Sequence, residues 1–301
     1  MRTLVIGLTG VVVAGVGLLA VPDASAIIVR HDVPDAEYVV ADADYPALVD
    51  LISRGDCIGT LIHESFVLSV AHCAVDLSMG DSLEVGGDAH VVAGVYLHPE
   101  WTDRDKYDIA LVRLEQPVTD VDPIPIYRGS DELGAMITLV GRGVTATGMD
   151  GEAGGHTDGK LRRATNVVSA ANDQFLQIVF ERPGQNGVTD LEGVGAAGDS
   201  GCPAFLDVDG TPYVAGLNSW GDGQPGIGIG QYGALDYQTR VSRFADWLDD
   251  VIESRAESTP DSDPHTDEDW SRVVPGSILA LLLVIGVAVG LRSLRTRARD
   301  S

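Results

Sequence analysis

The stretch that decides the fold is Gly198-Asp199-Ser200-Gly201-Cys202-Pro203. By itself, Gly-Asp-Ser-Gly indicates only a turn, because glycine adopts backbone conformations that other residues avoid. Glycines around a serine also allow the backbone N–H groups of Gly198 and Ser200 to point at one spot, which stabilising a developing oxyanion requires. Ser200 is therefore a candidate nucleophile, provided that a base and a group orienting that base occur elsewhere in the chain.

Candidates for both partners occur upstream of Ser200. Residues 69–73 read Ser-Val-Ala-His-Cys after the apolar run 66–70, and residues 107–112 read Tyr-Asp-Ile-Ala-Leu-Val. Without further evidence, a histidine such as His72 is usually structural. An aspartate such as Asp108, at the start of a strand, usually lies on the surface. Cys57 lies sixteen residues before Cys73, however, and a bridge between them would hold His72 at a strand end. Such a loop stabilises a fold by roughly 3 kcal/mol, and a buried Asp108 would fix the tautomer of His72.

In this order the motifs resemble the chymotrypsin/trypsin family of serine endopeptidases, in a prokaryotic member that is membrane-anchored or C-terminally tagged. The histidine, the aspartate and the serine occur in the same chain order as in chymotrypsin. The resemblance covers residues 27–252. Further stretches that match are Ile27-Ile28-Val29, His98-Pro99, Val140-Gly141-Arg142-Gly143, Asn218-Ser219-Trp220-Gly221 and Tyr237 to Val241 before a helix.

The resemblance implies hydrolysis of polypeptide substrates through an acyl-enzyme on Ser200. His72 would act as general base and then general acid, with Asp108 orienting it. The N–H groups of Gly198 and Ser200 would form the oxyanion hole. The implied substrate-binding residues are Val194, Ser219, Trp220 and Gly221.

Family members pair a free N-terminal ammonium with the aspartate before the serine, which is Asp199 here. Cleavage after Ala26 would free Ile27 directly, so that export itself would yield the active N-terminus. Ile28 is the alternative match and would need one more trim. The glycines that usually follow in the family are replaced by Arg30-His31.

Two positions depart from the family pattern. Val194 stands at the expected base of the primary specificity pocket and predicts an apolar or small residue before the scissile bond. Asp190, Asp222 and Asp236 remain open as acids that reach the pocket instead. Cys202 replaces a glycine and is interpreted as a buried thiol, with an intermolecular disulfide to another chain as the alternative.

The fold class is predicted to be all-β. Short apolar runs recur between turn signals, and 36 glycines accompany few aromatic residues. The resemblance specifies two six-stranded antiparallel β-barrels, at about 27–128 and 129–240, followed by a helix at 242–252. Five apolar residues support that helix at spacings of three and four, with aspartates on the other face: Phe244, Trp247, Leu248, Val251 and Ile252.

The two ends of the chain predict an exported protein. Residues 1–26 read as a signal peptide ending in Ala24-Ser25-Ala26, with an uncleaved anchor as the alternative. Residues 253–272 read as an acidic stalk. Residues 273–291 form an uncharged apolar run of about 28 Å as a helix, and residues 292–301 form a basic cytoplasmic tail. The protease domain would then be extracytoplasmic and held by one C-terminal transmembrane helix.

An alternative interpretation of the C-terminal end keeps the protein exported but not anchored. Pro275-Gly276-Ser277, the apolar run and the terminal arginines resemble bacterial sorting tags. Such tags are processed, so the protein would be released or attached to the surface.

Composition and spacing exclude several other functions. A formal charge of −25 argues against a nucleic-acid partner, and the histidines show no zinc spacing, so neither metal nor cofactor is expected. A second hypothesis of a different class is a catalytically silent relative that serves as a surface binding or adhesion module. The intact His72, Asp108 and Ser200 weigh against it.

Overall fold

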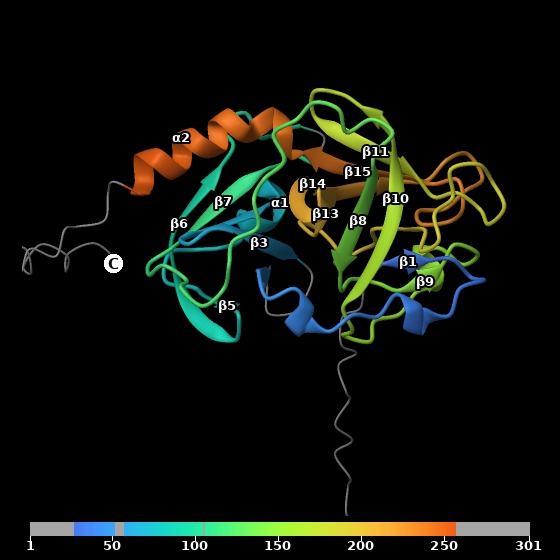
Figure 1. Ribbon diagram of the computed structural model, residues 1–301, viewed down its shortest axis with the longest axis horizontal. Helices are drawn as coiled ribbons and strands as arrows, with labels where there is room; N and C mark the ends of the chain where they lie inside the picture. Colours follow the sequence, from blue (N-terminus) through green and yellow to red (C-terminus); the bar gives the residue numbers. More distant parts are fainter. Residues whose placement is uncertain (1–26, 52–56, 105, 257–301) are drawn as a thin grey trace, which may run out of the picture. The chain divides into compact units, whose positions relative to one another are not determined.

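The computed structural model describes residues 27–51, 57–104 and 106–256 (Figure 1). These residues form two β-structures joined along the chain, with a small third sheet and a final helix. The strands are β1 (Ile28–Val29), β2 (Leu48–Asp50), β3 (Ile58–His63), β4 (Phe66–Ser69), β5 (Ser82–Val85), β6 (Asp88–Leu97), β7 (Ala110–Leu114), β8 (Met136–Gly141), β9 (Ala146–Thr147), β10 (Arg162–Ala171), β11 (Phe175–Val179), β12 (Gly193–Val194), β13 (Pro203–Val208), β14 (Thr211–Asp222) and β15 (Leu235–Arg240). The helices are α1 (Ala71–Ala74) and α2 (Ala245–Ala256), with short 3-10 turns at η1 (Asp35–Glu37), η2 (Asp42–Asp44), η3 (Glu152–Gly154) and η4 (Val241–Phe244).

The first β-structure is a six-stranded sheet in the order β2-β3-β4-β7-β6-β5. All its strand pairs are antiparallel. Its edge strands β2 and β5 approach to within 8 Å between Cα atoms but do not pair. The expected first barrel is therefore curled but not closed by hydrogen bonds. Alternation turns Leu83 and Val85 of β5 into its core and leaves Ser82 and Glu84 outside.

The second β-structure is a closed barrel in the order β10-β11-β15-β14-β13-β8. Its antiparallel ladders return to the first strand through β8 and β10. In β10 the residues that point inward are Ala164, Asn166 and Val168. Asn166 is tolerated there because its Nδ2 donates to the carbonyls of Val179 and Gly193.

The N-terminal strand β1 belongs to the small third sheet, between β12 and β9. Ile28 pairs with Val194 on one side and with Ala146 on the other. This pairing places the start of the described chain against the segment that leads into Ser200. Residues 27–29 are thus packed with the second β-structure, although the sequence assigned them to the first.

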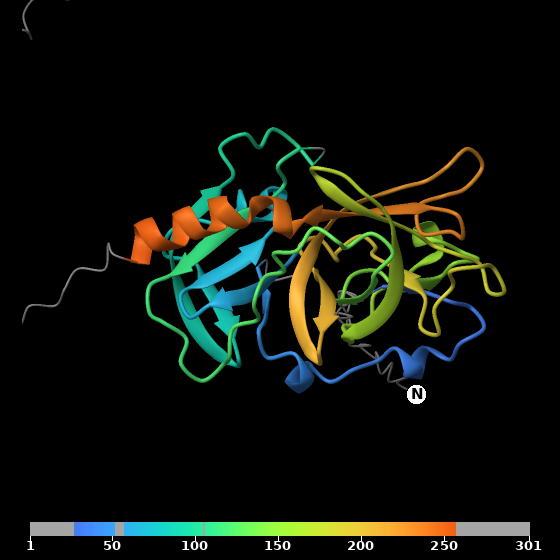
Figure 2. The same ribbon diagram turned by 45° about the horizontal axis from the view of Figure 1, so that its top comes forward.

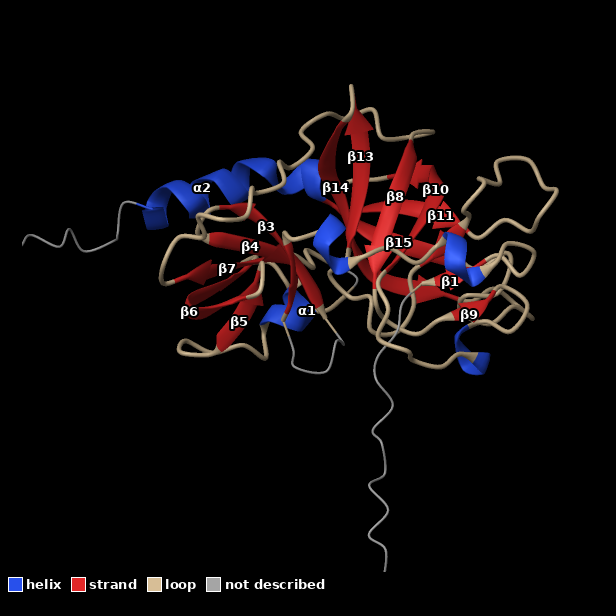
Figure 3. Ribbon diagram, turned by 60° about the horizontal axis from the view of Figure 1, so that its bottom comes forward, coloured by secondary structure: helices blue, strands red, loops and turns tan. Residues whose placement is uncertain are grey.

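The final helix follows the prediction at its start and exceeds it at its end. After η4, α2 runs to Ala256 and packs Leu248 into the first core together with Val241 and Phe244. In Figure 2 it passes in front of the first sheet, and in Figure 3 it lies beside that sheet. Arg255 extends the contact, because its guanidinium carbon lies 5.2 Å from the centre of the Tyr96 ring. Residues 253–256 are therefore helical rather than the start of a stalk.

The predicted fold class is wrong in one component, the transmembrane helix. No helix within the described ranges is both long and apolar enough to span a membrane. A run of apolar residues predicts such a helix from hydropathy alone, without evidence that the run forms one. Residues 273–291 lie outside the described residues, as do the predicted signal peptide 1–26, the rest of the stalk and the tail 292–301.

Candidate active site

His72 lies in α1, the single helical turn that follows β4. Its backbone N–H donates to Asp108 Oδ1 at 2.9 Å, and its ring Nδ1 lies 2.7 Å from Asp108 Oδ2. A carboxylate only accepts hydrogen bonds, so Nδ1 carries the proton and Nε2 is the free base position of the neutral ring. Nε2 is buried and has no hydrogen-bond partner within the described residues. The ring is thus oriented by two contacts with one side chain.

Asp108 precedes β7 and is fully buried. Besides His72 it holds the Ser219 hydroxyl, which donates to Oδ2 at 2.5 Å. Its own carbonyl accepts from Thr239 Oγ1 at 2.9 Å. The sequence placed Ser219 among substrate-binding residues and gave no signal of this contact, because the two positions lie on different β-structures. Ser219 and Thr239 lie on strands of the second barrel, and both donate hydrogen bonds to Asp108 of the first β-structure.

Ser200 is tied to the same disulfide that flanks His72. Cys57 and Cys73 form a bridge with 5.9 Å between their Cα atoms, which confirms the predicted disulfide. Ile58 N donates to the Ser200 carbonyl at 2.8 Å. The bridge therefore connects the segment that pairs with Ser200 to the helical turn of His72. No hydrogen bond joins the Ser200 hydroxyl to His72 Nε2 among the described residues.

Gly201 sets the backbone of the serine turn. It has φ +79°, and a Cβ there would lie 2.1 Å from the Ile58 carbonyl oxygen. Its N–H donates to the Asn218 carbonyl at 2.8 Å. The turn is thus held on one side by β3 and on the other by β14, and only glycine fits the close approach.

The amides of Gly198 and Ser200 are the predicted donors of the oxyanion hole. Neither N–H donates to another group within the residues that the structure describes. Gly198 has φ +92°, which turns the chain at this point. Hydrogen bonds that hold the preceding loop include those from Val144 N to the Ala197 carbonyl at 2.7 Å and from Asp199 N to the Ala196 carbonyl at 2.9 Å.

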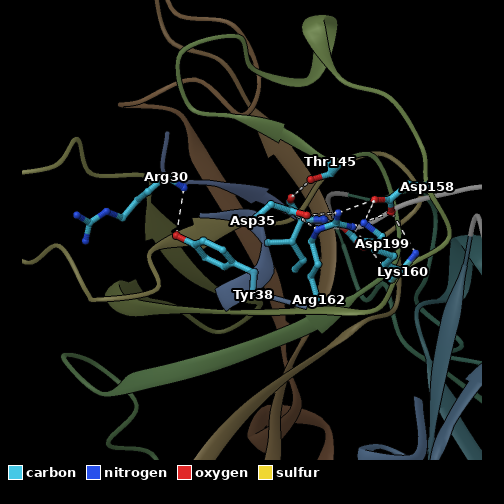
Figure 4. Close-up of polar contacts among 9 residues, drawn as sticks. Arg30, Asp35, Tyr38, Thr145, Asp158, Lys160, Arg162 and Asp199 are labelled. Atoms are coloured by element: carbon cyan, nitrogen blue, oxygen red, sulfur yellow. Dashed lines mark hydrogen bonds and ion pairs between the residues drawn. The ribbon is translucent and has the colours of Figure 1, made fainter. Parts of the chain in front are cut away.

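Asp199 is fully buried beneath this loop and meets the backbone of Ile27. Its Oδ2 accepts from Ile27 N at 3.1 Å and from Ala196 N at 3.0 Å, while Oδ1 accepts from Gly143 N at 2.7 Å. Burial raises the pKa of Asp199 to about 6, and these backbone donors act in the opposite direction. Thr145 Oγ1 holds the Ile27 carbonyl from the other side at 3.2 Å (Figure 4).

The segment that follows β1 is anchored by a buried arginine. Arg162 is 1% exposed and makes two hydrogen bonds each with Asp35 and Asp158, at 2.7 to 3.0 Å. These contacts raise the pKa of Arg162 and lower that of Asp158. Farther along the same segment, the backbone N–H of Arg30 donates a hydrogen bond to the Tyr38 hydroxyl (Figure 4). These contacts fix the segment that follows Ile27, the residue whose backbone N–H binds Asp199.

Cys202 is a buried thiol rather than an accessible one. It is 2% exposed, and its sulfur lies 3.7 Å from Asp199 Oδ1. Burial raises the pKa of this thiol well above its ordinary value, and the Asp199 charge raises it further. The packing supports the interpretation of a small core side chain, since a sulfur at this depth does not meet another chain.

The residues that were predicted to set specificity have different surroundings. Val194 is 2% exposed and belongs to the core cluster that includes Ile27 and Ile28. Trp220 stacks on Tyr237 with 3.9 Å between ring centres. Of the three acidic residues that were alternatives for the specificity pocket, Asp190 and Asp222 are exposed and Asp236 is buried. Sequence alone gave no way to choose among them.

Comparison with known proteins agrees with the fold. Residues 37–248 match the family model described as Trypsin. The chain is 28% identical over 231 residues to Vitamin K-dependent protein C of Rattus norvegicus, covering 69% of this chain and 48% of that protein. It is 29% identical over 219 residues to Serine proteinase stubble of Drosophila melanogaster, covering 64% of this chain and 26% of that protein.

The chain spans about half the length of the protein C relative and about a quarter of stubble. The family model, in contrast, covers more than half of this chain and includes both β-structures. Within the described ranges no group of three or more His, Cys, Asp or Glu is arranged to hold a metal ion. The chain belongs to the trypsin family.

Proposed function

We propose that this protein is a serine-type endopeptidase, which hydrolyses peptide bonds through an acyl-enzyme on Ser200, with His72 as the general base. One observation carries the proposal: Asp108 binds both the backbone N–H and the ring Nδ1 of His72, while the buried Nε2 has no hydrogen-bond partner in the part of the chain that the structure describes. A base held in one tautomer beside a serine turn is what nucleophilic catalysis needs. The hydrogen bond from Ile58 N to the Ser200 carbonyl supports the approach of Ser200 to His72.

In this mechanism the Ser200 oxygen bonds to the scissile carbonyl carbon while Nε2 of His72 takes the hydroxyl proton. Asp108 stabilises the imidazolium that forms. The N–H groups of Gly198 and Ser200 donate to the oxyanion of the tetrahedral intermediate. The C–N bond then breaks, and His72 returns the proton to the leaving amine. Water, activated by the same ring, hydrolyses the acyl ester and restores Ser200.

The substrate backbone would lie along the end of β14. Trp220 and Gly221 are near the end of this strand, directly after the residue that supports Asp108. Extended peptides bind by adding a strand to such an edge. Ser219 serves this mechanism chiefly through Asp108, because its hydroxyl is already committed to that carboxylate.

The active form would begin at Ile27, whose ammonium would pair with Asp199. The contact between Ile27 N and Asp199 Oδ2 supports this, since an ammonium at the same position would neutralise a buried carboxylate. N-terminal sequencing of the active enzyme tests the proposal. A start at Ile28 would favour the alternative match, and a start elsewhere would contradict the pairing.

The intramolecular disulfide supports an oxidising, extracytoplasmic location for the protease domain. Alkylation of the protein isolated without reductant should modify one cysteine at most, and only after denaturation, because Cys202 is buried. Modification of three cysteines would contradict the location.

Specificity for an apolar residue before the scissile bond stays a prediction from Val194. The packing of Val194 against β1 gives it no pocket-lining role among the described contacts.

Labelling with a fluorophosphonate tests the proposed function. The full chain should be labelled, and Ser200→Ala should abolish labelling. Ser169→Ala is a matched control, because that exposed serine lies on β10 and has no part in the mechanism. Persistent labelling of Ser200→Ala, or none in correctly folded wild type, would refute the proposal; the second result would favour a silent binding module.

A further inference from the structure

The peptide group between Ala197 and Gly198 decides where the Gly198 N–H points. A trans peptide is planar, so its carbonyl and its N–H point in opposite directions. The Ala197 carbonyl accepts a hydrogen bond from Val144 N at 2.7 Å, and a Cβ on Gly143 would lie 2.5 Å from the same oxygen. The carbonyl therefore faces the loop that contains Gly143 and Val144, and the Gly198 N–H faces away from that loop.

Glycine does not hold this orientation by itself. Gly198 has φ +92°, and glycine adopts positive and negative φ about equally readily. The peptide group can therefore turn over with little backbone strain, which would place the Ala197 carbonyl where the Gly198 N–H had pointed. A carbonyl oxygen in that place would repel an oxyanion. Contacts from outside the turn must hold the orientation that oxyanion binding needs.

Glu152 supplies such a contact to the preceding peptide group. Its Oε1 accepts a hydrogen bond from Ala197 N at 2.5 Å. The carbonyl of that same peptide group, on Ala196, accepts from Asp199 N at 2.9 Å. A carboxylate acceptor makes a shorter and stronger hydrogen bond than a neutral one. The peptide groups on both sides of the Ala197 Cα are therefore held, which restricts rotation at this residue.

The backbone of Glu152 is itself fixed where η3 begins. Its N–H donates to the Ile229 carbonyl at 3.0 Å, and its carbonyl accepts from Gly155 N at 3.0 Å. Gly151 has φ +65°, and a Cβ there would lie 2.8 Å from the Ile229 carbonyl oxygen. The carboxylate thus reaches Ala197 from a backbone that packs closely against the loop of Ile229.

The loop that carries Glu152 is also attached to β1. Ala146 pairs with Ile28, and Gly148 N donates to the Val29 carbonyl at 3.0 Å. The strand that places Ile27 N on Asp199 therefore supports this loop as well. Glu152 gives β1 a second connection to the turn before Ser200, besides the one through Asp199.

We propose, given the acyl-enzyme mechanism above, that Glu152 is a positioning residue for the oxyanion hole. By binding the Ala197 N–H, its carboxylate holds the turn in which the Gly198 N–H points at the developing oxyanion. Glu152 acts through Ala197 and not on the reacting atoms.

This role affects the transition state more than substrate binding. The oxyanion forms only when Ser200 attacks the scissile carbonyl, so the orientation of the Gly198 N–H stabilises the transition state and not the intact substrate. Losing the acceptor on Glu152 should therefore lower kcat and leave KM near its wild-type value. A residue that only stabilised the fold would not produce this division.

Steady-state cleavage by the full chain of one library peptide that the wild type cleaves tests the proposal. Glu152→Ala should lower kcat about fivefold, the factor to which a typical net hydrogen-bond contribution amounts, with KM changed by less than about twofold. Glu152→Gln keeps an acceptor oxygen and should recover most of the wild-type kcat. Asp150→Ala is the matched control and should keep it, because this exposed carboxylate of the same loop accepts from Thr147 Oγ1.

A peptidyl trifluoromethyl ketone tests the oxyanion hole directly. Ser200 Oγ bonds to its carbonyl carbon, the hydroxyl proton passes to His72, and the carbonyl oxygen becomes an oxyanion in the hole. The inhibition constant should rise about fivefold in Glu152→Ala, in parallel with the loss of kcat. It should stay near the wild-type value in Glu152→Gln and Asp150→Ala. An unchanged kcat in Glu152→Ala, a loss confined to KM, an equal loss in Asp150→Ala, or no recovery in Glu152→Gln would overturn the inference.

Hydrogen exchange separates this inference from the proposed function, because it requires no catalysis. In the full chain carrying Ser200→Ala, the Ala197 amide should exchange about fivefold faster when Glu152→Ala is added. Adding Asp150→Ala instead should leave that rate unchanged. A wild type that fluorophosphonate does not label overturns the proposed function, and Ala197 exchange that depends on Glu152 would then still support the positioning of the turn. Exchange insensitive to Glu152 overturns the inference in either case.

Discussion

Replacing Asp236 by asparagine should change how stability depends on pH. The comparison is made in a Ser200→Ala background, so that self-cleavage does not interfere. Asparagine keeps an oxygen for the Gly195 and Asn218 donors, and its amide can donate to Gln238 Oε1, a buried atom with no hydrogen-bond partner within the described residues. The variant thus retains most local contacts and removes only the group that titrates.

The magnitude follows from the shift of the Asp236 pKa from its ordinary 3.8 to about 7. Because the folded-state pKa is raised, the stabilisation from the protonated form is fully present below pH 3.8 and is lost as pH rises through 7. Three pKa units at about 1.36 kcal/mol each correspond to about 4 kcal/mol. Between pH 4 and pH 8, the free energy of unfolding of the parent should fall by about that amount relative to Asp236→Asn.

Urea unfolding monitored by tryptophan fluorescence at intervals from pH 4 to pH 8 measures this difference. Asp199 titrates in the same sense, with a pKa raised to about 6, but it is present in both proteins and largely cancels. Asp222→Asn is the matched control, since an exposed carboxylate should leave the curves parallel to the parent. Parallel curves for Asp236→Asn would refute the reasoning, because they would mean that Asp236 is not desolvated in the folded protein.

Three further predictions address the mechanism and its support. Asp108→Asn should lower kcat by about 10⁴-fold, because the amide favours the wrong tautomer of the ring; peptide turnover measures it, and a loss below tenfold would contradict the role of Asp108. Removing the bridge with Cys57→Ser and Cys73→Ser should lower the free energy of unfolding by roughly 3 kcal/mol, and an unchanged urea midpoint would count against it. Gly201→Ala should lower the melting temperature and slow fluorophosphonate labelling, because its Cβ would lie 2.1 Å from the Ile58 carbonyl; wild-type values for both would show that the turn has room.

Much of the fold follows from local patterns in the sequence. The family resemblance is confirmed by the matched family model, the disulfide by the bond between Cys57 and Cys73, and the final helix, which was predicted from its apolar spacing, by α2. These features depend on short-range residue order, which a sequence displays directly. The transmembrane helix was a wrong prediction, since hydropathy reports the composition of a run and not whether a helix forms there.

The residues that are chemically competent can be recognised in the sequence: a serine in a glycine turn, a histidine beside a cysteine, and an aspartate at the start of a buried strand. Which distant positions meet depends on the folded chain. It placed the Ser219 hydroxyl on Asp108 and buried Asp236, not Asp190 or Asp222, beside Gln238. Desolvation and hydrogen-bond partners depend on strand register between segments far apart in the chain. An aspartate in the sequence therefore does not reveal which groups will surround its carboxylate.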